Sequence, residues 1–277
     1  MYFFIGCAIL CNTLEIPIGG KNVIKLIACD IDGTVLEPDE RFLPKELLEQ
    51  AERLIRKGMV FCFSSGRQFS NLRILAEHLV DRFYYICDNG AIVYSDGKIP
   101  EILSQTAMDH EDAIRIANEI IETPGLELEV SGSNTGFLYI KTEAFQNLML
   151  SYQGMNLIRI HSARQLPDTV LKISIYSKSA EKLFPVLSRE WGSKYHVAIA
   201  GEHWVDITLA DKGTGISALC RHLGIGLESV AAFGDNYNDI AILDLVGHPY
   251  MKSTSPDDLL KRYPNSFSNV ADVLKTF

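Results

Sequence analysis

Short apolar runs alternate with amphipathic segments over the first ninety residues of the chain. The runs KLIACD (25–30), MVFCFS (59–64) and FYYIC (83–87) are almost wholly apolar, which is typical of strands buried on both faces of a sheet. Between them, PKELLEQAERLIRK (44–57) repeats its apolar residues at helical spacing behind a leading proline, and QFSNLRILAEHLV (68–80) continues this rhythm. The alternation predicts a parallel sheet with helices on both faces.

The rhythm changes after residue 90 and returns near residue 209. AIVYSDGKIPEIL (91–103) predicts a hairpin, and beyond it alternating strands are mixed with helices. The first pattern resumes with KGTGISALCRHLG (212–224), which is followed by another buried strand. The predicted fold class is therefore α/β, with a Rossmann-like, doubly wound parallel-sheet core formed by 23–90 and 209–277 and an inserted α+β domain at 91–208.

Composition and charge limit the partners. The chain has 277 residues, of which 47% are hydrophobic and 22% charged, and a net charge of −9. No run of Lys and Arg occurs, which argues against a nucleic acid or an anionic membrane as partner, so any anionic ligand must be held by local charge. The six cysteines include no CxxC and no Cys/His set with zinc spacing, which favours a reducing, cytoplasmic location.

The segment 1–22 precedes the first predicted strand. Its apolar stretch is too short to span a bilayer, and it lacks the basic region that opens a signal peptide. We interpret 1–22 as an N-terminal extension of the core or as the product of a mis-assigned start. Mass spectrometry of the native protein separates these two interpretations, because an intact Met1 contradicts the second.

Polar residues stand at four places where the predicted core strands end or a helix begins. DIDGT (30–34) follows the first strand, and SSGR (64–67) follows the second. Lys212-Gly213 opens the helix after the insert, and GDNYND (234–239) follows the strand SVAAF. Because ligands of doubly wound sheets bind at the carboxyl ends of the strands, we expect these four segments to meet at one site.

The two carboxylates of DIDGT need a compensating charge. Asp30 and Asp32, if about 4 Å apart, repel each other by roughly 4 kcal/mol at an effective dielectric constant near 20. Mg²⁺ prefers hard oxygen ligands, and Lys212 would add a second positive charge. The residues alone therefore indicate a metal-dependent site for phosphoryl transfer. The plainer alternative for Asp30 and Asp32 is a solvated turn or helix-cap pair.

DxDGT, SGR, KG and GDxxND, in this order and with a domain inserted between the second and third, resemble the haloacid dehalogenase superfamily. Within it the chain looks like the Cof-type phosphatases of subfamily IIB, which carry a C2B cap. The resemblance covers nearly all of the chain after Val23. It implies a Mg²⁺-dependent phosphatase that hydrolyses a small phosphorylated metabolite, such as a sugar phosphate, through an aspartyl phosphate. The inserted domain would be a cap that closes over the site and excludes bulk water.

The resemblance also implies roles for single residues. Asp30 corresponds to the nucleophile, and Asp32 corresponds to the general acid that then activates the hydrolytic water. The implied metal ligands are Asp30, Asp235, the backbone carbonyl of Asp32 and, through a water, Asp239. The implied phosphate-binding groups are the N–H of Ile31, Ser65, the N–H of Gly66, Lys212 and Asn238. Asn89 and Arg67 are further candidates for contacts with the substrate, although Arg67 could equally form a structural ion pair.

Two other functions fit the same residues. A hexose-phosphate mutase is one, since phosphomannomutases share this type of cap. A non-catalytic protein that binds a phosphorylated metabolite is the other, and it would be expected to lack a catalytic residue. Lys252–Pro256 replaces a Gly-Asn-Ala loop that the family often has after VGHPYM, which puts the rim of the site in question. The sequence indicates neither the physiological substrate nor whether the chain is a monomer or a dimer.

Overall fold

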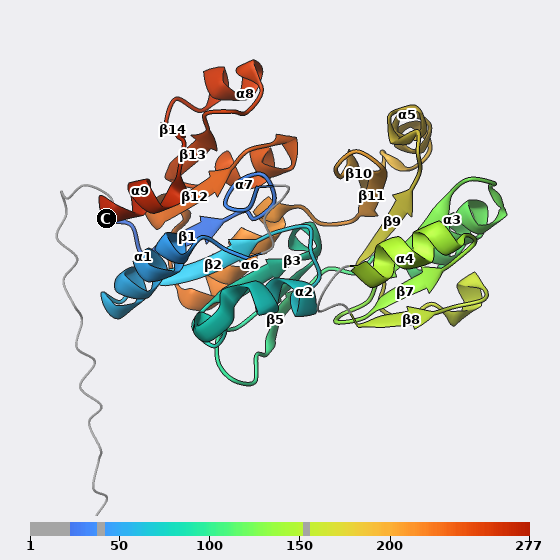
Figure 1. Ribbon diagram of the computed structural model, residues 1–277, viewed down its shortest axis with the longest axis horizontal. Helices are drawn as coiled ribbons and strands as arrows, with labels where there is room; N and C mark the ends of the chain where they lie inside the picture. Colours follow the sequence, from blue (N-terminus) through green and yellow to red (C-terminus); the bar gives the residue numbers. More distant parts are fainter. Residues whose placement is uncertain (1–22, 38–41, 152–155) are drawn as a thin grey trace, which may run out of the picture.

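The computed structural model describes residues 23–37, 42–151 and 156–277. Their strands form an eight-stranded sheet and a six-stranded sheet. Figure 1 shows the two sheets with their helices as two lobes that lie side by side. We call the lobe with the eight-stranded sheet the core and the lobe with the six-stranded sheet the cap. The extension expected at 1–22 lies outside the described residues.

The core sheet has the strand order β14-β13-β12-β1-β2-β3-β4-β5. Neighbours from β14 to β3 are parallel, and β4 and β5 run antiparallel to their neighbours. The chain moves from β1 through β2 and β3, and after the cap it returns to β12 on the other side of β1. This reversal is the switch point at which doubly wound sheets bind ligands. The strands are β1 (Leu26–Cys29), β2 (Val60–Ser64), β3 (Tyr84–Cys87), β4 (Ile92–Tyr94), β5 (Ile102–Gln105), β12 (Val230–Gly234), β13 (His248–Lys252) and β14 (Ser266–Phe267).

Helices cover both faces of the core sheet, which confirms the predicted fold class. On one face α1, α2 and α9 pack against Ile27, Phe61 and Phe63. On the other face α6, α7 and α8 pack against alternate strand residues such as Leu26 and Cys62. Each strand therefore buries both of its faces, as the continuous apolar runs predict. The helices are α1 (Lys45–Arg56), α2 (Phe69–Arg73), α6 (Lys212–Leu223), α7 (Ile240–Leu243), α8 (Asp257–Arg262) and α9 (Val270–Lys275).

The hairpin of β4 and β5 corrects the boundary expected for the insert. The sequence assigns 91–103 to the inserted domain, whereas Ile92 pairs with Cys87 and Val93 with Ile86 in the core sheet. The reason is the tight turn directly after β3, which reverses the chain so that β4 lies against β3 instead of starting a new sheet. We therefore place the start of the cap after β5.

The helix predicted at 68–80 is interrupted. Its first residues form α2, and the chain then continues as the 3₁₀ helix η1 (Ile74–Leu79). Glu77 within η1 has φ 48° and ψ −122°, which no helix accommodates. The prediction is right about the position of a helical segment and wrong about its continuity. The other 3₁₀ helices are η2 (Asp88–Gly90), η3 (Ala163–Gln165), η4 (Leu227–Ser229) and η5 (Tyr237–Asp239).

The cap sheet has the strand order β10-β11-β9-β6-β7-β8 and is antiparallel except for the pair β7–β8. Helices α3 and α5 pack on one face, and α4 packs on the other beside Tyr176 and Trp204. This mixture is the predicted α+β arrangement. The elements are α3 (His110–Glu122), β6 (Glu127–Ser131), β7 (Gly136–Tyr139), α4 (Glu143–Ser151), β8 (Leu157–Arg159), β9 (Lys172–Tyr176), α5 (Ala180–Trp191), β10 (His196–Ile199) and β11 (Trp204–Thr208).

The face of the cap sheet that carries α4 continues into a patch of buried polar side chains. Side chains two residues apart on a strand share a face, and paired residues stand side by side. In the register of β6, β9 and β11, two rows of polar residues therefore lie together on this face. All of them are buried, so the core covers them instead of water. We call this set the polar face of the cap: Glu129, Ser131, Lys172, Ser174, Asp206 and Thr208.

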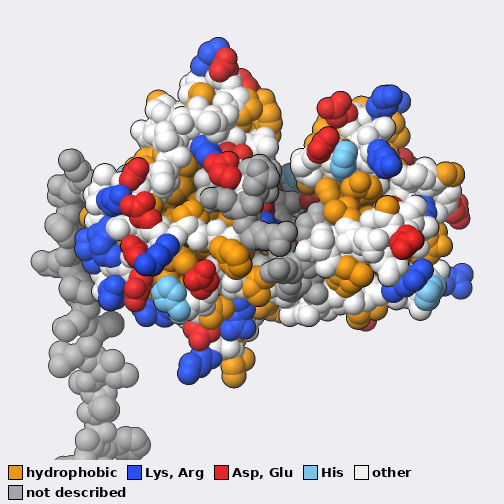
Figure 2. All heavy atoms as spheres, in the orientation of Figure 1, with side chains coloured by type: hydrophobic (Ala, Val, Ile, Leu, Met, Phe, Trp, Pro, Cys, Tyr) orange, Lys and Arg blue, Asp and Glu red, His pale blue; other side chains and the backbone are white. Residues whose placement is uncertain are grey.

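On the side shown in Figure 2, Lys and Arg side chains are interspersed with Asp and Glu side chains, as expected of a chain without basic runs. None of the helices in the described part of the chain has the length and apolar character that crossing a membrane requires.

Candidate active site

The predicted site residues gather at the switch point between β1 and β12. The two strands pair directly, with Cys29 beside Phe233, and the Asp30 N–H donates to the Phe233 carbonyl at 3.0 Å. Asp30 therefore leaves β1 next to the turn that begins at Asp235 after β12. On the other side, Cys29 pairs with Phe63 of β2, which brings SSGR alongside DIDGT.

Lys212 joins the two acidic segments. Its Nζ lies 2.6 Å from Asp30 Oδ1 and 2.5 Å from Asp239 Oδ1, and its side chain is 0% exposed. It begins α6, whose N-terminus is fixed by a capping box between Asp211 and Thr214. Burial by itself would lower the pKa of Lys212, but Asp239 and Asp30 outweigh burial and raise that pKa above its usual value. Lys212 is a buried ammonium held between two carboxylates.

Three carboxylates crowd this ammonium. Oxygens of Asp30, Asp235 and Asp239 lie within 4.8 Å of one another. Burial raises the pKa of Asp30 well above its ordinary value, and Asp239 and Asp235 add to the shift while Lys212 opposes it. One ammonium leaves part of this negative charge without a counter-charge. A hard divalent cation with a preference for oxygen ligands, such as Mg²⁺, fits this donor set.

Neighbouring groups hold the acids in place. Thr34 Oγ1 donates to Asp235 Oδ1 at 2.8 Å. Asp239 Oδ2 accepts from the N–H groups of Asp235 and Asn236 at 3.0 and 3.1 Å, so both oxygens of Asp239 have protein partners. Gly33 has a φ of +85°, and a Cβ there would lie 2.3 Å from Asp235 Oδ2. Only glycine allows the DIDGT loop to approach Asp235 this closely.

The carboxylate of Asp32 is not part of the group formed by the other three acids. Its two oxygens accept from Arg67 Nε at 2.9 Å and Nη2 at 2.6 Å, and its side chain is 56% exposed. Such a two-pronged contact fixes the orientation of both groups. Of the two roles left open for Arg67, the ion pair is the one formed in this structure. The metal contact expected of Asp32 uses its backbone carbonyl and does not involve this carboxylate.

The loop after β2 is tied to the site through its backbone. Ser65 is buried, its Oγ accepts from the Arg67 N–H at 3.2 Å, and its carbonyl accepts from the Asn89 N–H at 3.0 Å. The Gly66 carbonyl accepts from Lys172 Nζ at 2.7 Å. Ile31 is also buried, and its carbonyl accepts the hydrogen bonds that close the turn within DIDGT. The predicted phosphate-binding loop is therefore in contact with both lobes.

The two predicted asparagines lie in different surroundings. Asn238 is exposed in η5. Asn89 lies against the cap, where its Nδ2 donates to Asp206 Oδ2 at 3.2 Å, and a Cβ placed on Gly66 would lie 3.1 Å from its Oδ1. Asp88 and Asn89 both have left-handed φ angles, 49° and 55°, which costs non-glycine residues on the order of 1 kcal/mol each. This strained turn aims Asn89 at the cap.

A second buried lysine lies at the contact between the lobes, and the sequence did not predict it. Lys172 Nζ lies 3.5 Å from Asp88 Oδ1 and 3.5 Å from Asp206 Oδ2, and these side chains are 8%, 1% and 5% exposed. Glu129, 5% exposed, completes the group and accepts from Gln68 Nε2 at 2.7 Å. We call Lys172, Asp88, Asp206 and Glu129 the interface cluster. The strands KISIY and WVDIT gave a weak signal, because their alternating polar positions are also typical of a face in water.

The acids of the interface cluster have shifted pKa values. Burial raises the pKa of Asp88 to about 6, with Lys172 opposing the shift. Burial raises the pKa of Glu129 to about 7, again with Lys172 opposing it. Burial would lower the pKa of Lys172, but Asp206, Asp88 and Glu129 outweigh burial and raise it. The cluster therefore holds a charged lysine and two acids that titrate near neutral pH.

Lys252 ends β13 and begins the segment that departs from the family pattern, and it also reaches the site. Its Nζ donates to the Gly33 carbonyl at 2.6 Å and to a Glu37 carboxylate oxygen. The side chain is 7% exposed. The departure noted at the rim thus places a buried cation against the DIDGT loop.

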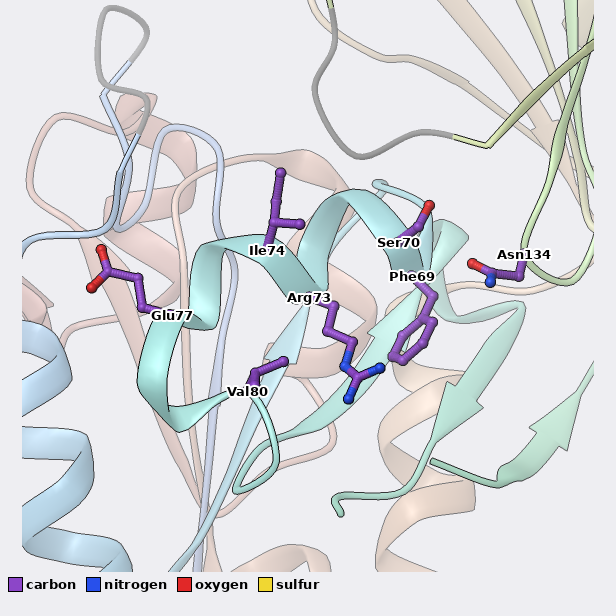
Figure 3. Close-up of a pocket in the computed structure, with 7 residues that line it drawn as sticks. All are labelled: Phe69, Ser70, Arg73, Ile74, Glu77, Val80 and Asn134. Carbon is purple, nitrogen blue, oxygen red and sulfur yellow. The ribbon is translucent and has the colours of Figure 1, made fainter. Parts of the chain in front are cut away.

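The cavity of ≈ 410 Å³ in Figure 3 lies outside this group of residues. Its lining comes from α2, η1, the residue after η1 and the cap loop with Asn134, whose side chain points toward α2. None of the predicted site residues lines this cavity. The lining residues are Phe69, Ser70, Arg73, Ile74, Glu77, Val80 and Asn134.

Comparisons with known proteins give the family and the fold of the chain. The family described as haloacid dehalogenase-like hydrolase matches residues 27–269. A protein of Serratia proteamaculans named HMP-PP phosphatase is 25% identical over 265 residues, covering 84% of this chain and 88% of its own. A crystal structure from Eubacterium rectale is 30% identical, with a TM-score of 0.79 over 92% of this chain and 99% of its own. A sugar phosphatase of haloacid dehalogenase subclass IIB shares the fold at 21% identity, with a TM-score of 0.75 over 91% and 98% of the two chains.

Proposed function

The chain belongs to the haloacid dehalogenase-like hydrolases, and from this premise we propose that it is a Mg²⁺-dependent phosphatase of small phosphorylated metabolites that works through an aspartyl phosphate on Asp30. The observation that carries the proposal is the buried group in which Lys212 Nζ lies 2.6 Å from Asp30, with Asp235 and Asp239 within 4.8 Å. Two of the compared proteins support it by name, one as a phosphatase and one as a sugar phosphatase. The described cysteines are free and buried, which supports a cytoplasmic location.

In the proposed reaction Asp30 attacks phosphorus. The bond between its carboxylate oxygen and phosphorus forms while the bond from phosphorus to the leaving alkoxide breaks. Asp32 gives a proton to the alkoxide, and after the product has left it takes a proton from the water that hydrolyses the aspartyl phosphate. Asp32 exchanges its contact with Arg67 for the leaving group, and until then this ion pair fixes the direction of the carboxylate.

The remaining groups stabilise charge on the phosphoryl oxygens. Lys212, the hydroxyl of Ser65 and the N–H groups of Ile31 and Gly66 would bind these oxygens, and Asn238 would reach one from the rim. Mg²⁺ would be held by Asp30, Asp235, the carbonyl of Asp32 and, through a water, Asp239. Bound there, the ion neutralises charge on the phosphoryl group and offsets the repulsion among the carboxylates.

The interface cluster favours a hydrolase over a hexose-phosphate mutase. A mutase passes through a bisphosphate, so it has to hold a second phosphate at the far end of the sugar, on the side of the cap. Next to the phosphate-binding loop the cap presents Glu129 and Asp206, and among the described residues Lys172 is the one cation paired with this group. Carboxylates in that position repel a phosphate. The non-catalytic alternative is disfavoured because every residue of the four motifs that the chemistry needs is present.

Hydrolysis of p-nitrophenyl phosphate tests the proposal. We expect turnover that needs Mg²⁺, stops with EDTA and returns when Mg²⁺ is added back. Asp30→Asn should lower kcat by about 10³-fold or more, because it removes the nucleophile. Asp168→Asn, at an exposed aspartate of the cap, is the matched control and should keep full activity. Full activity of Asp30→Asn would remove Asp30 as the nucleophile.

A further inference from the structure

We propose that the polar face of the cap, together with Asp88, Asn89 and Gln68, is the subsite for the leaving group and selects phosphoesters whose leaving group is uncharged or cationic and rich in hydroxyl or amino donors. This inference rests on the proposed phosphatase function and adds the class of substrate to it. It would exclude leaving groups that carry a second phosphate or a carboxylate.

The position of the polar face comes first in the argument. Lys172 Nζ donates to the carbonyl of Gly66, whose N–H is expected to bind the phosphate. Asn89 connects the same glycine to the cap, since its Oδ1 lies close to Gly66 and its Nδ2 donates to Asp206 at 3.2 Å. A molecule with its phosphate against Ser65 and Gly66 therefore has the polar face as its nearest cap surface.

The balance of charge comes second. Three carboxylates, those of Asp88, Asp206 and Glu129, surround the single ammonium of Lys172, and all four residues are nearly fully buried. Charges in a buried site interact more strongly than charges in water. A further anion would therefore be repelled here, whereas an ammonium would be attracted and a hydroxyl tolerated.

The supply of acceptors comes third. Among the described residues, Oε1 of Gln68 and Oδ1 of Asn89 are buried without a hydrogen-bond partner, and the carboxylate of Asp88 has the Lys172 ammonium at 3.5 Å. Gln68 and Asp88 are 4% and 1% exposed, so water at the surface does not satisfy them. Buried polar atoms in native proteins are nearly always paired. The donors nearby, Lys172, Ser131 and Ser174, are already engaged with Gly66, Glu129 and Asp206. These acceptors match a ligand that brings its own N–H or O–H donors.

The test uses two substrates of equal length that differ at one end. Sorbitol 6-phosphate ends in a hydroxymethyl group, and 6-phosphogluconate ends in a carboxylate. We expect kcat/KM of the wild type to favour sorbitol 6-phosphate by about tenfold or more, because like charges brought together on binding oppose association. Glucosamine 6-phosphate, with an ammonium group, should be favoured over glucose 6-phosphate in the same assay.

Variants show whether the interface cluster sets this ratio. In assays at pH 8, above the pKa of Glu129, Glu129→Gln and Asp206→Asn each remove a negative charge and should lower the preference for sorbitol 6-phosphate. Lys172→Met removes the positive charge and should raise it. A purely structural role would not move the ratio in opposite directions. Glu181→Gln, at an exposed glutamate of α5, is the control and should leave the ratio unchanged.

The outcomes separate the two proposals. The subsite is overturned if the wild type hydrolyses p-nitrophenyl phosphate but has the same kcat/KM for sorbitol 6-phosphate and 6-phosphogluconate. The proposed phosphatase function is not affected by that result. Unchanged ratios in Glu129→Gln and Asp206→Asn also overturn the subsite, and circular dichroism checks that each variant is folded. If no phosphoester is hydrolysed, both the proposed phosphatase function and the proposed subsite are contradicted.

Discussion

Among the residues that the structure describes, Lys212 and Lys172 are each buried among several carboxylates, and their surroundings differ. Lys212 touches Asp30 and Asp239 at 2.6 and 2.5 Å, within the core and 0% exposed. Lys172 lies 3.5 Å from Asp88 and from Asp206, and its shortest contact, 2.7 Å, is to the carbonyl of Gly66. In both places the carboxylates outweigh burial and raise the pKa of the lysine.

The difference between the contacts of Lys212 and those of Lys172 indicates that the two lysines have different roles. A salt bridge at hydrogen-bond distance in a buried site holds both partners in one position, as a nucleophile and its neighbouring cation require. Around Lys172 the oxygens of Asp88 and Asp206 lie at 3.5 Å, and the neighbouring Oε1 of Gln68 and Oδ1 of Asn89 are buried without a hydrogen-bond partner. That arrangement leaves acceptors for a ligand. The short contacts around Lys212 suit a catalytic site, and the longer contacts of the interface cluster suit the binding of a ligand.

Of the substitutions that test the comparison between the two lysines, Lys212→Met is expected to have the largest effect on activity and stability. It removes the only cation in contact with Asp30 and Asp239 among the described residues, so buried carboxylates lose their partner. We expect p-nitrophenyl phosphatase activity to fall by about 10²–10³-fold and the free energy of unfolding in EDTA to fall by about 3–5 kcal/mol. Enzyme assays and urea titrations measure the two effects.

Lys45→Met is the matched control for this substitution. Lys45 pairs with Glu49 one helical turn away, and its side chain is 90% exposed. Exposed pairs of this kind contribute about 0.3–0.5 kcal/mol, so the control should leave activity and stability nearly unchanged. If Lys212→Met kept wild-type stability in EDTA, the buried ammonium would not be what holds the three acids together.

A smaller loss of stability is expected from Lys172→Met. Two of its acids have pKa values near 6 and 7, so at neutral pH they can take up protons when the ammonium is removed. We expect the free energy of unfolding to fall by about 1–3 kcal/mol at pH 7, from the lost hydrogen bond to Gly66 and the charge left unpaired. Urea titration measures it. A loss as large as that in Lys212→Met would show that the two clusters are equally tight.

The core site could be predicted from the sequence because its residues stand in order at strand ends. Asp30 and Asp235 each follow an apolar run that predicts a buried strand. Lys212 begins a helix, and the residues that cap this helix, Asp211 and Thr214, lie next to it in the sequence. The parallel sheet then brings these ends to one edge. The structure adds the partner of Asp32, because the contact with Arg67 depends on side-chain directions that spacing does not give.

The interface cluster could not be predicted for a physical reason. Glu129, Lys172 and Asp206 lie on β6, β9 and β11, which are neighbours in the sheet although other strands separate them in the chain. Each strand alone alternates polar and apolar residues, which is equally typical of a sheet with one face in water. Only the covering core turns that polar face into a buried one. The hairpin of β4 and β5 was misplaced for a similar reason, since its pairing with β3 follows from a turn and not from its own pattern.

The smallest expected effect, in Glu129→Gln, sharpens the comparison through pH. Burial raises the pKa of Glu129 to about 7, above its ordinary value, while Lys172, Asp88 and Asp206 face it from β9, η2 and β11. Between about pH 5 and pH 7 the unfolded chain has lost most of this proton while the folded chain still holds much of it, so the contribution of Glu129 to stability falls as pH rises. We therefore expect the free energy of unfolding of Glu129→Gln to rise by about 1–2 kcal/mol relative to the wild type between those pH values, since Gln stays neutral throughout.

Urea midpoints of both proteins measure this change, and Glu181→Gln, exposed on α5, should show no such gain. A constant difference between Glu129→Gln and the wild type at both pH values would mean that Glu129 is already ionised at pH 5, and that the acids around Lys172 are held as firmly as those around Lys212.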